Sequence, residues 1–244
     1  MDSSMYIAMS AAKQDLMRTA IVAQNVANAN TVGFKSDHAE FQPLFAQMTN
    51  TLNSGAYTQL ETMQVNTARG TYRTTGLSND LSARNGFWIA VSLPDGTEGY
   101  ITTATTMTDK NGVLRTAQGN IVLGNRGKIK IQDGNNYRFT SNGSITVRNN
   151  DTTEVIDKLK VVEMNGKALI KGPYGVLTRR DGRAMSAVVA DGAILPGVLE
   201  NSNVNSMVAM TESLEIAKSY QDQINMIMAA KTLDKNSNSL IKLN

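Results

Sequence analysis

The sequence predicts an α+β protein in which a helix at each end of the chain pairs with the other as a coiled coil, with a central antiparallel all-β domain. Three observations predict this fold class: apolar residues recur at steps of three and four near the amino terminus, the same rhythm returns near the carboxyl terminus, and short β-type runs separated by glycine turns fill the middle. We expect an N-terminal helix in residues 1–34, an extended linker with short strands in 35–80, the β domain in 81–196 and a C-terminal helix in 197–244.

The first helix is predicted from a stripe that begins close to the amino terminus. Its positions follow alternating steps of four and three, which is the spacing of a coiled-coil seam. They are Met5, Met9, Ala12, Leu16, Thr19, Ala23 and Val26. An asparagine-rich stretch follows, in which Asn28 and Asn30 tolerate left-handed backbone and Gly33 adopts a positive φ at little cost. We therefore expect the helix to end in a turn, with Phe34 folded back onto its last turn.

The middle of the chain changes character twice. Residues 35–80 are rich in Thr, Asn and Gln and irregular in pattern, which is typical of an extended segment. Beyond them, the runs 87–93 and 99–103 flank Pro94-Asp95-Gly96, and this tripeptide favours the tight turn of a hairpin. Further Asn-Gly and Asp-Gly pairs between short runs favour an antiparallel sandwich or barrel.

The second helix is predicted from a similar stripe after residue 197. The positions are Met207, Met210, Leu214, Ala217, Ile224 and Met228, with Gln221 at the one interrupted step. Ser202, Asn203 and Asn205 precede the stripe and are candidates to cap the free amides of the helix. Because methionine-rich stripes adapt to several partner geometries, the two seams favour packing between subunits. For the seams, the alternative is an intramolecular pair of helices lying on the β domain. For the asparagine clusters, the alternative is ordinary capping at two unrelated helix ends.

Composition argues against most kinds of chemistry. The chain has no cysteine, so disulfides and thiolate metal sites are excluded. Its single histidine, His38, lies in a polar stretch without a second histidine to complete a metal site. Gly119–Arg126 has the glycine spacing of a phosphate loop, but Asn125 stands where lysine is required. We expect neither an enzyme nor a cofactor; the alternative is a β-domain enzyme or carbohydrate-binding protein with helical oligomerisation arms, since carboxylates are plentiful.

Charge and hydropathy restrict the partners. The formal net charge is +3 and the basic residues are scattered, so we expect no binding to nucleic acid. We also expect no membrane insertion and no cleaved secretory signal, because no apolar run is long enough for either. These features predict a cytoplasmic protein unless export uses a route without a cleaved signal.

Three stretches resemble the flagellar rod and hook family. "NVANANTVGFK" looks like the amino-terminal signature of that family, through Asn25, Asn28, Asn30, Thr31, Gly33, Phe34 and Lys35. "LENSNVNSMVAM" is similar to its carboxy-terminal signature, through Leu199, Glu200, Ser202, Asn203, Val204 and Asn205. "GFWIAVSLPDGTEGY" resembles its central hairpin. These matches occur in order across nearly the whole chain.

The resemblance implies a structural role. Members of the family pack their terminal helices into an inner tube of coiled coils and place the β domain outside it. The resemblance also implies export through the flagellar type III apparatus without a cleaved signal peptide. Assembly in the periplasm would then join copies of this chain with proximal and distal rod subunits into a drive shaft around the export channel. The opening "MDSSMYIAM" and the length resemble proximal rod members, with distal rod members as the alternative.

Overall fold

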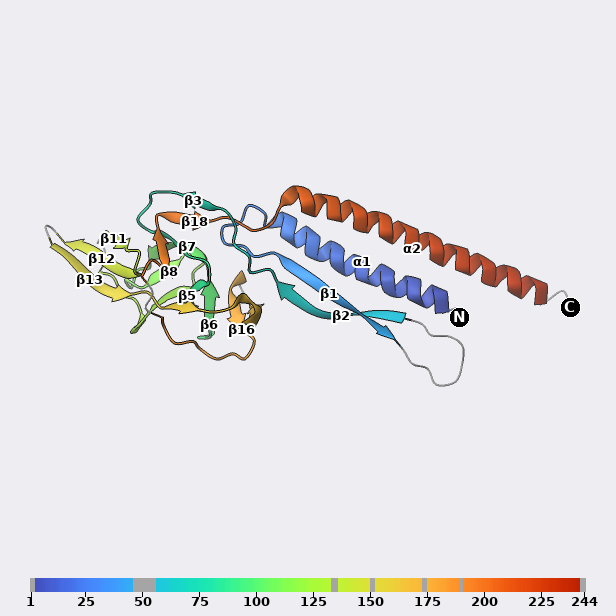
Figure 1. Ribbon diagram of the computed structural model, residues 1–244, viewed down its shortest axis with the longest axis horizontal. Coiled ribbons are helices and arrows are strands. Elements are labelled where there is room, and N and C mark those ends of the chain that lie inside the picture. The colour runs from blue at the N-terminus through green and yellow to red at the C-terminus, as the bar shows by residue number, and fades with distance from the viewer. Residues whose placement is uncertain are drawn as a thin grey trace. The chain divides into compact units, whose positions relative to one another are not determined.

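The chain divides into two compact units, which are described separately. The computed structural model describes residues 3–45, 56–132, 136–149, 152–172, 175–188 and 191–241 (Figure 1). Within this part, the helical unit draws on residues 1–29, 37–64 and 204–244, and the β unit draws on 30–36 and 65–203. A helix towards each end of the sequence and antiparallel strands between them establish the predicted α+β class.

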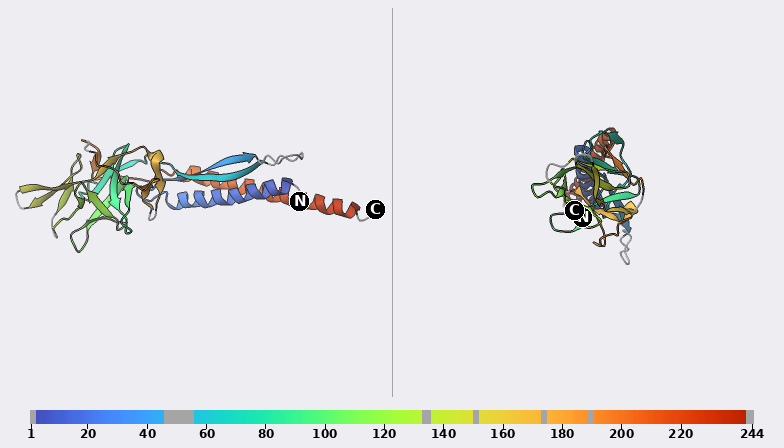
Figure 2. Two further views of the ribbon diagram at one scale, coloured as in Figure 1. Left: turned by 90° about the horizontal axis from the view of Figure 1, so that it is seen from below. Right: turned by 90° about the vertical axis from the view of Figure 1, so that its left-hand side faces the viewer.

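The helical unit contains α1 (Ser3–Ala27), α2 (Ser206–Ile241) and a two-stranded sheet of β1 (Asp37–Phe45) and β2 (Ala56–Val65). The two helices run antiparallel, and β1 and β2 lie beside α1 (Figure 2). The segment predicted as an extended linker with short strands therefore contains strands of 9 and 10 residues. No helix in the described part of the chain combines the length and apolarity needed to cross a membrane.

A narrow set of small apolar residues packs α1 against α2. Val22, Ala209 and Ile216 form a buried cluster, with Val26 and Val204 packed against it. Among the residues of the predicted stripes, Ala12 is buried, and Met5, Val26 and Ile224 are half-buried. The remaining stripe residues are exposed: Met9, Leu16, Thr19, Ala23, Met207, Met210, Leu214, Ala217 and Met228. Most of both predicted stripes thus faces away from the contact between the two helices.

The β unit is built on a sheet of eleven strands within the described residues. Its path runs through β15 (Leu169–Lys171), β16 (Leu177–Arg179), β6 (Glu98–Ile101), β5 (Phe87–Ser92), β9 (Ile121–Gly124), β8 (Leu114–Thr116), β7 (Thr103–Thr108), β4 (Asp80–Ala83) and β17 (Ile194–Pro196). Two further strands join this path, namely β10 (Gly127–Lys128) on β9 and β14 (Val161–Glu163) on β5. A 3-10 turn, η1 (Gly166–Ala168), precedes β15.

Two smaller sheets complete the β unit. One has the order β11 (Tyr137–Phe139), β12 (Ser144–Asn149) and β13 (Thr152–Lys158), and the other pairs β3 (Tyr72–Thr74) with β18 (Val198–Glu200). The strand pairs described for this unit are antiparallel, as predicted. The predicted hairpin is also confirmed, because β5 pairs with β6 and Gly96 in the connecting turn has a φ of 85°.

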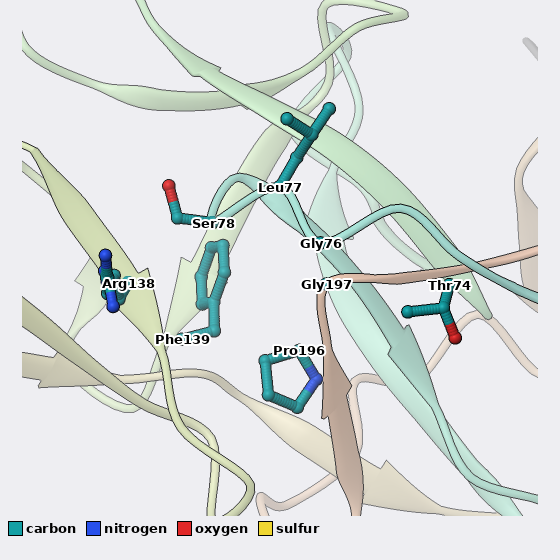
Figure 3. Close-up of a pocket in the computed structure, with 8 residues that line it drawn as sticks. All are labelled: Thr74, Gly76, Leu77, Ser78, Arg138, Phe139, Pro196 and Gly197. Carbon is teal, nitrogen blue, oxygen red and sulfur yellow. The ribbon is translucent and has the colours of Figure 1, made fainter.

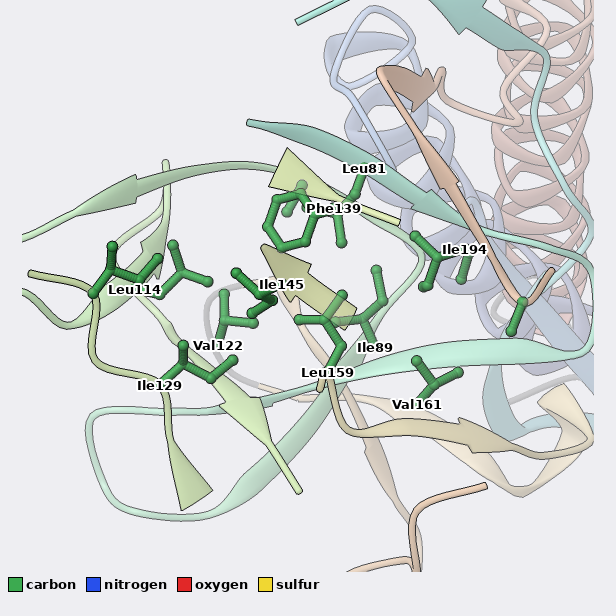
Figure 4. Close-up of a cluster of buried hydrophobic side chains, with 14 of the residues drawn as sticks. Leu81, Ile89, Leu114, Val122, Ile129, Phe139, Ile145, Leu159, Val161 and Ile194 are labelled. Carbon is green, nitrogen blue, oxygen red and sulfur yellow. The ribbon is translucent and has the colours of Figure 1, made fainter. Parts of the chain in front are cut away.

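Strand β5 is buried on both faces and separates two apolar clusters. Ile89 packs into the larger cluster, which Figure 4 shows gathered from β4, β8, β9, β12 and β17. Trp88 and Ala90 point the other way and pack with Tyr100 and Leu177. A strand covered on both sides reads as a continuous apolar run, which is what the sequence Phe87–Val91 shows.

The turn that follows α1 in the sequence begins the β unit. The predicted positive φ of Gly33 is confirmed, at 72°. A Cβ atom added to Gly33 would lie 2.7 Å from Cγ2 of Thr103. Thr103 has little freedom to move, because its hydroxyl donates to the carbonyl of Leu81 at 2.9 Å and accepts from the backbone N–H of Glu200 at 3.2 Å. Both backbone conformation and space therefore require glycine at this position.

We predict that Gly33→Ala lowers the free energy of unfolding of the β unit by about 2–4 kcal/mol, the sum of a positive-φ cost near 1 kcal/mol and an overpacking cost. Gly119→Ala is the matched control, since Gly119 has a φ of 89° with open space around the added Cβ, and it should cost only about 1 kcal/mol. Urea unfolding followed by fluorescence measures both, because Trp88 is the sole tryptophan and lies buried in this unit. Equal losses for the two variants would contradict the steric argument.

Candidate functional site

Residues from the two terminal motifs meet inside the β unit. The backbone N–H of Gly33 donates to the carbonyl of Glu200 at 2.8 Å, and that of Asn203 donates to the carbonyl of Phe34 at 3.3 Å. The side-chain oxygen of Asn203 accepts from the N–H of Ser36 at 2.8 Å. Segments 30–36 and 198–203, far apart in the sequence, are thus held side by side by hydrogen bonds.

A buried ion pair joins the same two segments. Nζ of Lys35 lies 2.6 Å from Oε1 of Glu200, and the carboxylate side chain has no exposed surface. Nζ of Lys35 also donates to the carbonyl of Ala68 at 2.8 Å. Nη1 of Arg69 lies 2.9 Å from Oε2 of Glu200, and the backbone N–H of Gly70 donates to Oε1 at 2.8 Å. We call Lys35, Arg69 and Glu200 the charge cluster.

Arg69 connects the charge cluster to the main sheet. Its Nη2 donates to the carbonyls of Arg84 at 2.9 Å and Phe87 at 2.6 Å, on either side of the turn between β4 and β5. Its guanidinium also lies over the ring of Trp88, 5.1 Å from the centroid. A planar group with several donors is suited to such a position, since it can bind a carboxylate and two carbonyls at once.

The ring of Phe34 makes a cation–π contact with Lys171. Nζ of Lys171 lies 4.1 Å from the centroid of the Phe34 ring and donates to the carbonyl of Lys35 at 3.3 Å. The ring is half-buried and its cation comes from β15. The segment that contains Gly33, Phe34 and Lys35 is therefore fixed by side chains from several parts of the β unit.

The electrostatics of the charge cluster favour a permanent ion pair. Burial alone would raise the pKa of Glu200, but Lys35 and Arg69 outweigh burial and hold that pKa below its usual value. Burial lowers the pKa of Lys35, and the neighbouring carboxylate of Glu200 opposes this effect. The carboxylate is ionised and accepts three hydrogen bonds, so it is poorly suited to proton transfer. Its surroundings are cationic, so it is also poorly suited to binding a metal.

The other predicted motif residues have local roles. Asn25 exchanges two 2.9 Å hydrogen bonds with the backbone of Asp37 and so joins α1 to β1 in the helical unit. The amide of Asn28 donates to the carbonyl of Gln24 at 2.9 Å. Asn205 caps α2, since its side-chain oxygen accepts from the N–H groups of Met207 and Val208.

The remaining candidates differ in burial. Leu199 and Ser202 are buried, whereas Asn30 and Thr31 are exposed. Asn203, also considered as a cap, instead donates to the carbonyls of Asn66 and Ala68 within the β unit.

Sequence reasoning missed Arg69 and its neighbour Gly70. Both lie in the polar stretch "NTARGT", which has no alternation and no motif that would mark a buried cation. A Cβ atom on Gly70 would lie 2.0 Å from the carbonyl oxygen of Asn201, so the two backbones approach too closely for any other residue. The Arg-Gly pair is the one local sign of this arrangement.

Two further features bear on chemistry. In the described residues, no group of three or more His, Asp and Glu side chains is arranged to hold a metal ion. An open groove of about 490 Å³ in the β unit has apolar, glycine and polar lining residues (Figure 3): Leu77, Phe139, Pro196, Gly76, Gly197, Thr74, Ser78 and Arg138. The residues that line this groove include no pair of a nucleophile and a base of the kind used in catalysis.

We predict that Glu200→Gln lowers the free energy of unfolding of the β unit by about 3–5 kcal/mol, because it leaves Lys35 and Arg69 buried without an anion. Glu163→Gln is the matched control: it makes the same change at an exposed position and should cost less than about 0.5 kcal/mol. Urea unfolding followed by the fluorescence of Trp88 measures both variants.

Acid provides an internal check on this prediction. Because the folded pKa of Glu200 is lowered, its stabilisation is complete above the unfolded value of about 4.3 and is lost as the pH falls through the folded value. The stability gap between the natural protein and Glu200→Gln should therefore narrow below about pH 4. A gap that is absent at pH 7, or that widens in acid, would contradict the assignment.

Comparison with known proteins accounts for both motifs. Residues 5–35 match the family described as "Flagella basal body rod protein", and residues 195–240 match "Flagellar basal body rod FlgEFG protein C-terminal". The chain is 30% identical over 254 aligned residues to the flagellar basal-body rod protein FlgF of Escherichia coli K12, with all of both chains covered. It is 29% identical to FlgF of Salmonella typhimurium over the same extent. It is also 26% identical to FlgG of Borreliella burgdorferi, covering 88% of this chain and 92% of the relative. The chain belongs to the flagellar basal-body rod protein family.

Proposed function

We propose that this protein is a structural subunit of the proximal part of the flagellar rod, and that it polymerises through the exposed apolar stripes of α1 and α2. Its partners are copies of itself and the neighbouring proximal and distal rod subunits. The observation that carries this proposal is the presence of two apolar faces on α2, one covered by α1 and the other exposed.

The covered face of α2 contains Ala209 and Ile216, which pack against Val22 of α1. The exposed face contains Met207 and Leu214, which are 76% and 73% exposed. Met207 precedes Ala209 by two residues, and Leu214 precedes Ile216 by two. Two residues correspond to about 200° around a helix, so the covered and exposed faces point in nearly opposite directions. Exposed apolar residues that recur on one face of a helix are typical of an interaction site.

The α1 helix contributes exposed apolar residues as well. Met9 and Leu16 are 54% and 56% exposed and lie seven residues apart, on one stripe. Each of them follows a buried residue, namely Ala8 and Asp15. Since α1 and α2 present different stripes, neighbouring subunits would use different patches on each copy, as open helical assembly requires.

The lengths of the helices add to this argument. At 1.5 Å per residue, the 25 residues of α1 extend about 38 Å and the 36 residues of α2 about 54 Å. One α1 helix is therefore too short to cover the whole of α2. Neighbouring subunits would supply the missing partner surface in an inner tube of coiled coils, and the lumen of that tube would form the export channel.

The charge cluster suits a subunit that carries load. Segment 30–36 follows α1 in the sequence and segment 198–203 precedes α2, so force along either helix enters the β unit through one of these segments. Lys35 and Glu200 join the two segments directly. Transmission of torque along the rod requires packing of this kind rather than catalysis.

Export and location follow from the same role. A rod subunit would leave the cell through the flagellar type III apparatus without a cleaved signal peptide and assemble in the periplasm. A distal rod subunit is the alternative, supported by the similarity to proteins named FlgG. We favour the proximal rod because three of the alignments to proteins named FlgF cover all of this chain, whereas those to proteins named FlgG cover 82–92% of it.

We predict that Leu214→Lys abolishes swimming of the host while leaving the monomer folded, because it places a charge on the exposed stripe without touching the α1–α2 contact. Val155→Lys is the matched control: Val155 is 59% exposed on β13, away from both helices in the sequence, and its replacement should leave swimming unchanged. Motility in soft agar and electron microscopy of basal bodies measure the effect, with the gene-deletion strain as reference.

The deletion strain also separates the two rod positions. A rod that stops close to its base supports the proximal assignment, whereas a rod that lacks only its outer section supports the distal one. A complete rod in the deletion strain, or normal swimming with Leu214→Lys, would contradict the proposed function.

A further inference from the structure

The α1–α2 contact is made largely of small apolar side chains. Val22, Ala209 and Ile216 are buried in it, with Val26 and Val204 packed against them, and α1 also buries Ala8 and Ala12. Small side chains specify the relative position of two helices weakly, because a slip by one heptad replaces one shallow contact by another. Apolar packing alone therefore leaves the register of this helix pair poorly determined.

One buried charge interrupts this contact. Asp15 is only 5% exposed although it carries a carboxylate. Its Oδ2 accepts a hydrogen bond of 3.1 Å from Nε2 of Gln223 on the opposite helix. Its Oδ1 lies 3.9 Å from Nη1 of Arg18, one turn along α1. The amide of Gln223 thus provides the hydrogen bond to Asp15 across the helix pair.

Arg18 extends the contact to a second position on α2. Its Nη2 lies 3.6 Å from Oε1 of Glu212, and both side chains are 42% exposed. Because Gln223 and Glu212 are eleven residues apart, or about three helical turns, the two polar contacts act at separate points along α2. A single relative position of the helices satisfies both.

The side chain of Gln223 leaves one of its own polar atoms without a hydrogen bond among the described residues. Its Oε1 atom is buried and has no hydrogen-bond partner within the part of the chain that the structure describes. An acceptor in this state destabilises the folded chain. Maximal stability is therefore a poor explanation for a glutamine at this position, whereas specification of register is a known use of a polar residue in a helix–helix seam.

A slip of one heptad in either direction separates Asp15 from Gln223. If α2 moved by seven residues, Asp15 would face Ile216 or Ala230 in place of Gln223. Both replacements are apolar and would leave the buried carboxylate without its hydrogen bond from α2. In one of the two directions Gln223 would also enter the apolar cluster around Val22.

We propose that Asp15 and Gln223 are register-determining residues, which fix the axial position of α1 against α2 and thereby the alignment of the two exposed stripes. A slip of seven residues would move one stripe about 10 Å along the other. A neighbouring subunit that contacts both helices would then no longer fit. The consequence for assembly rests on the proposed function, whereas the register itself does not.

Spin labels test the register directly. The chain lacks cysteine, so Ala20→Cys and Ala229→Cys, both at exposed positions, place one label on each helix. The two positions are offset along the helix axis. A slip by one heptad, which moves one helix about 10 Å along the other, therefore changes the distance between the labels. Distance distributions from pulsed electron paramagnetic resonance are compared among four monomeric proteins, with circular dichroism as the check on helix content.

The four proteins differ only at the polar positions. The natural pair should give one narrow distance, and Asp15→Leu with Gln223→Leu should add a second, shifted distance at unchanged helix content. Lys13→Leu with Gln221→Leu makes the same types of change at exposed positions and should keep the single distance. The exchange variant, Asp15→Gln with Gln223→Asp, restores a polar pair in reverse and should restore the single distance.

Two results would overturn the proposal: a single unshifted distance in the Asp15→Leu, Gln223→Leu protein, or several distances in the natural one. Motility separates this outcome from the proposed function. If the double-leucine protein shows the slipped register but supports normal swimming, the register assignment stands and the role of the stripes in assembly fails.

Discussion

The carboxylate of Glu200 is the group on which the arrangement of the β unit most depends. It is fully buried, and it accepts hydrogen bonds from Lys35, Arg69 and the backbone of Gly70. A buried charge is tolerated only when it is paired and hydrogen-bonded, so each of these donors must be in place for the others to be stable. The cluster therefore makes folding of the β unit depend on segments from both ends of its sequence.

The charge cluster accounts for part of the two asparagine-rich stretches that mark the sequence. Asn203 donates to the carbonyls of Asn66 and Ala68 and accepts from Ser36, which satisfies the backbone around the ion pair. Asn25 and Asn205 act at helix positions instead, one on the backbone of Asp37 and the other on the first turn of α2. Similar residue types thus serve two purposes, and local sequence alone does not separate them.

The strands and turns of the β unit were predictable because residues that are close together in the sequence determine them. Pro94-Asp95-Gly96 favours a tight turn whatever surrounds it, and the side chains from Phe87 to Ala90 pack alternately into two apolar clusters. The charge cluster was not predictable in the same way. Lys35 and Glu200 are 165 residues apart, and Arg69 lies in a stretch without a motif. The long strands β1 and β2 likewise arise where the sequence shows no regular alternation.

The helices show a different limit of prediction. The predicted stripe on α1 shares Met5, Ala12 and Val26 with the covered side of the helix. At three other steps it takes an exposed residue in place of the buried one before it: Met9 for Ala8, Leu16 for Asp15, and Ala23 for Val22. Hydrophobicity favoured Leu16 over Asp15, although Asp15 is the buried one. Spacing alone therefore identifies a helix with an apolar side, but not which of two adjacent stripes is covered within the chain.

A double-mutant cycle on Lys35 and Glu200 tests the central claim most directly. Lys35→Met, Glu200→Gln and the combined variant are unfolded in urea at pH 7, with the fluorescence of buried Trp88 as the probe of the β unit. A direct buried ion pair predicts that the combined loss is smaller than the sum of the single losses by about 2 kcal/mol or more. Losses that add to within about 0.5 kcal/mol would show that the two residues act independently and would contradict the account.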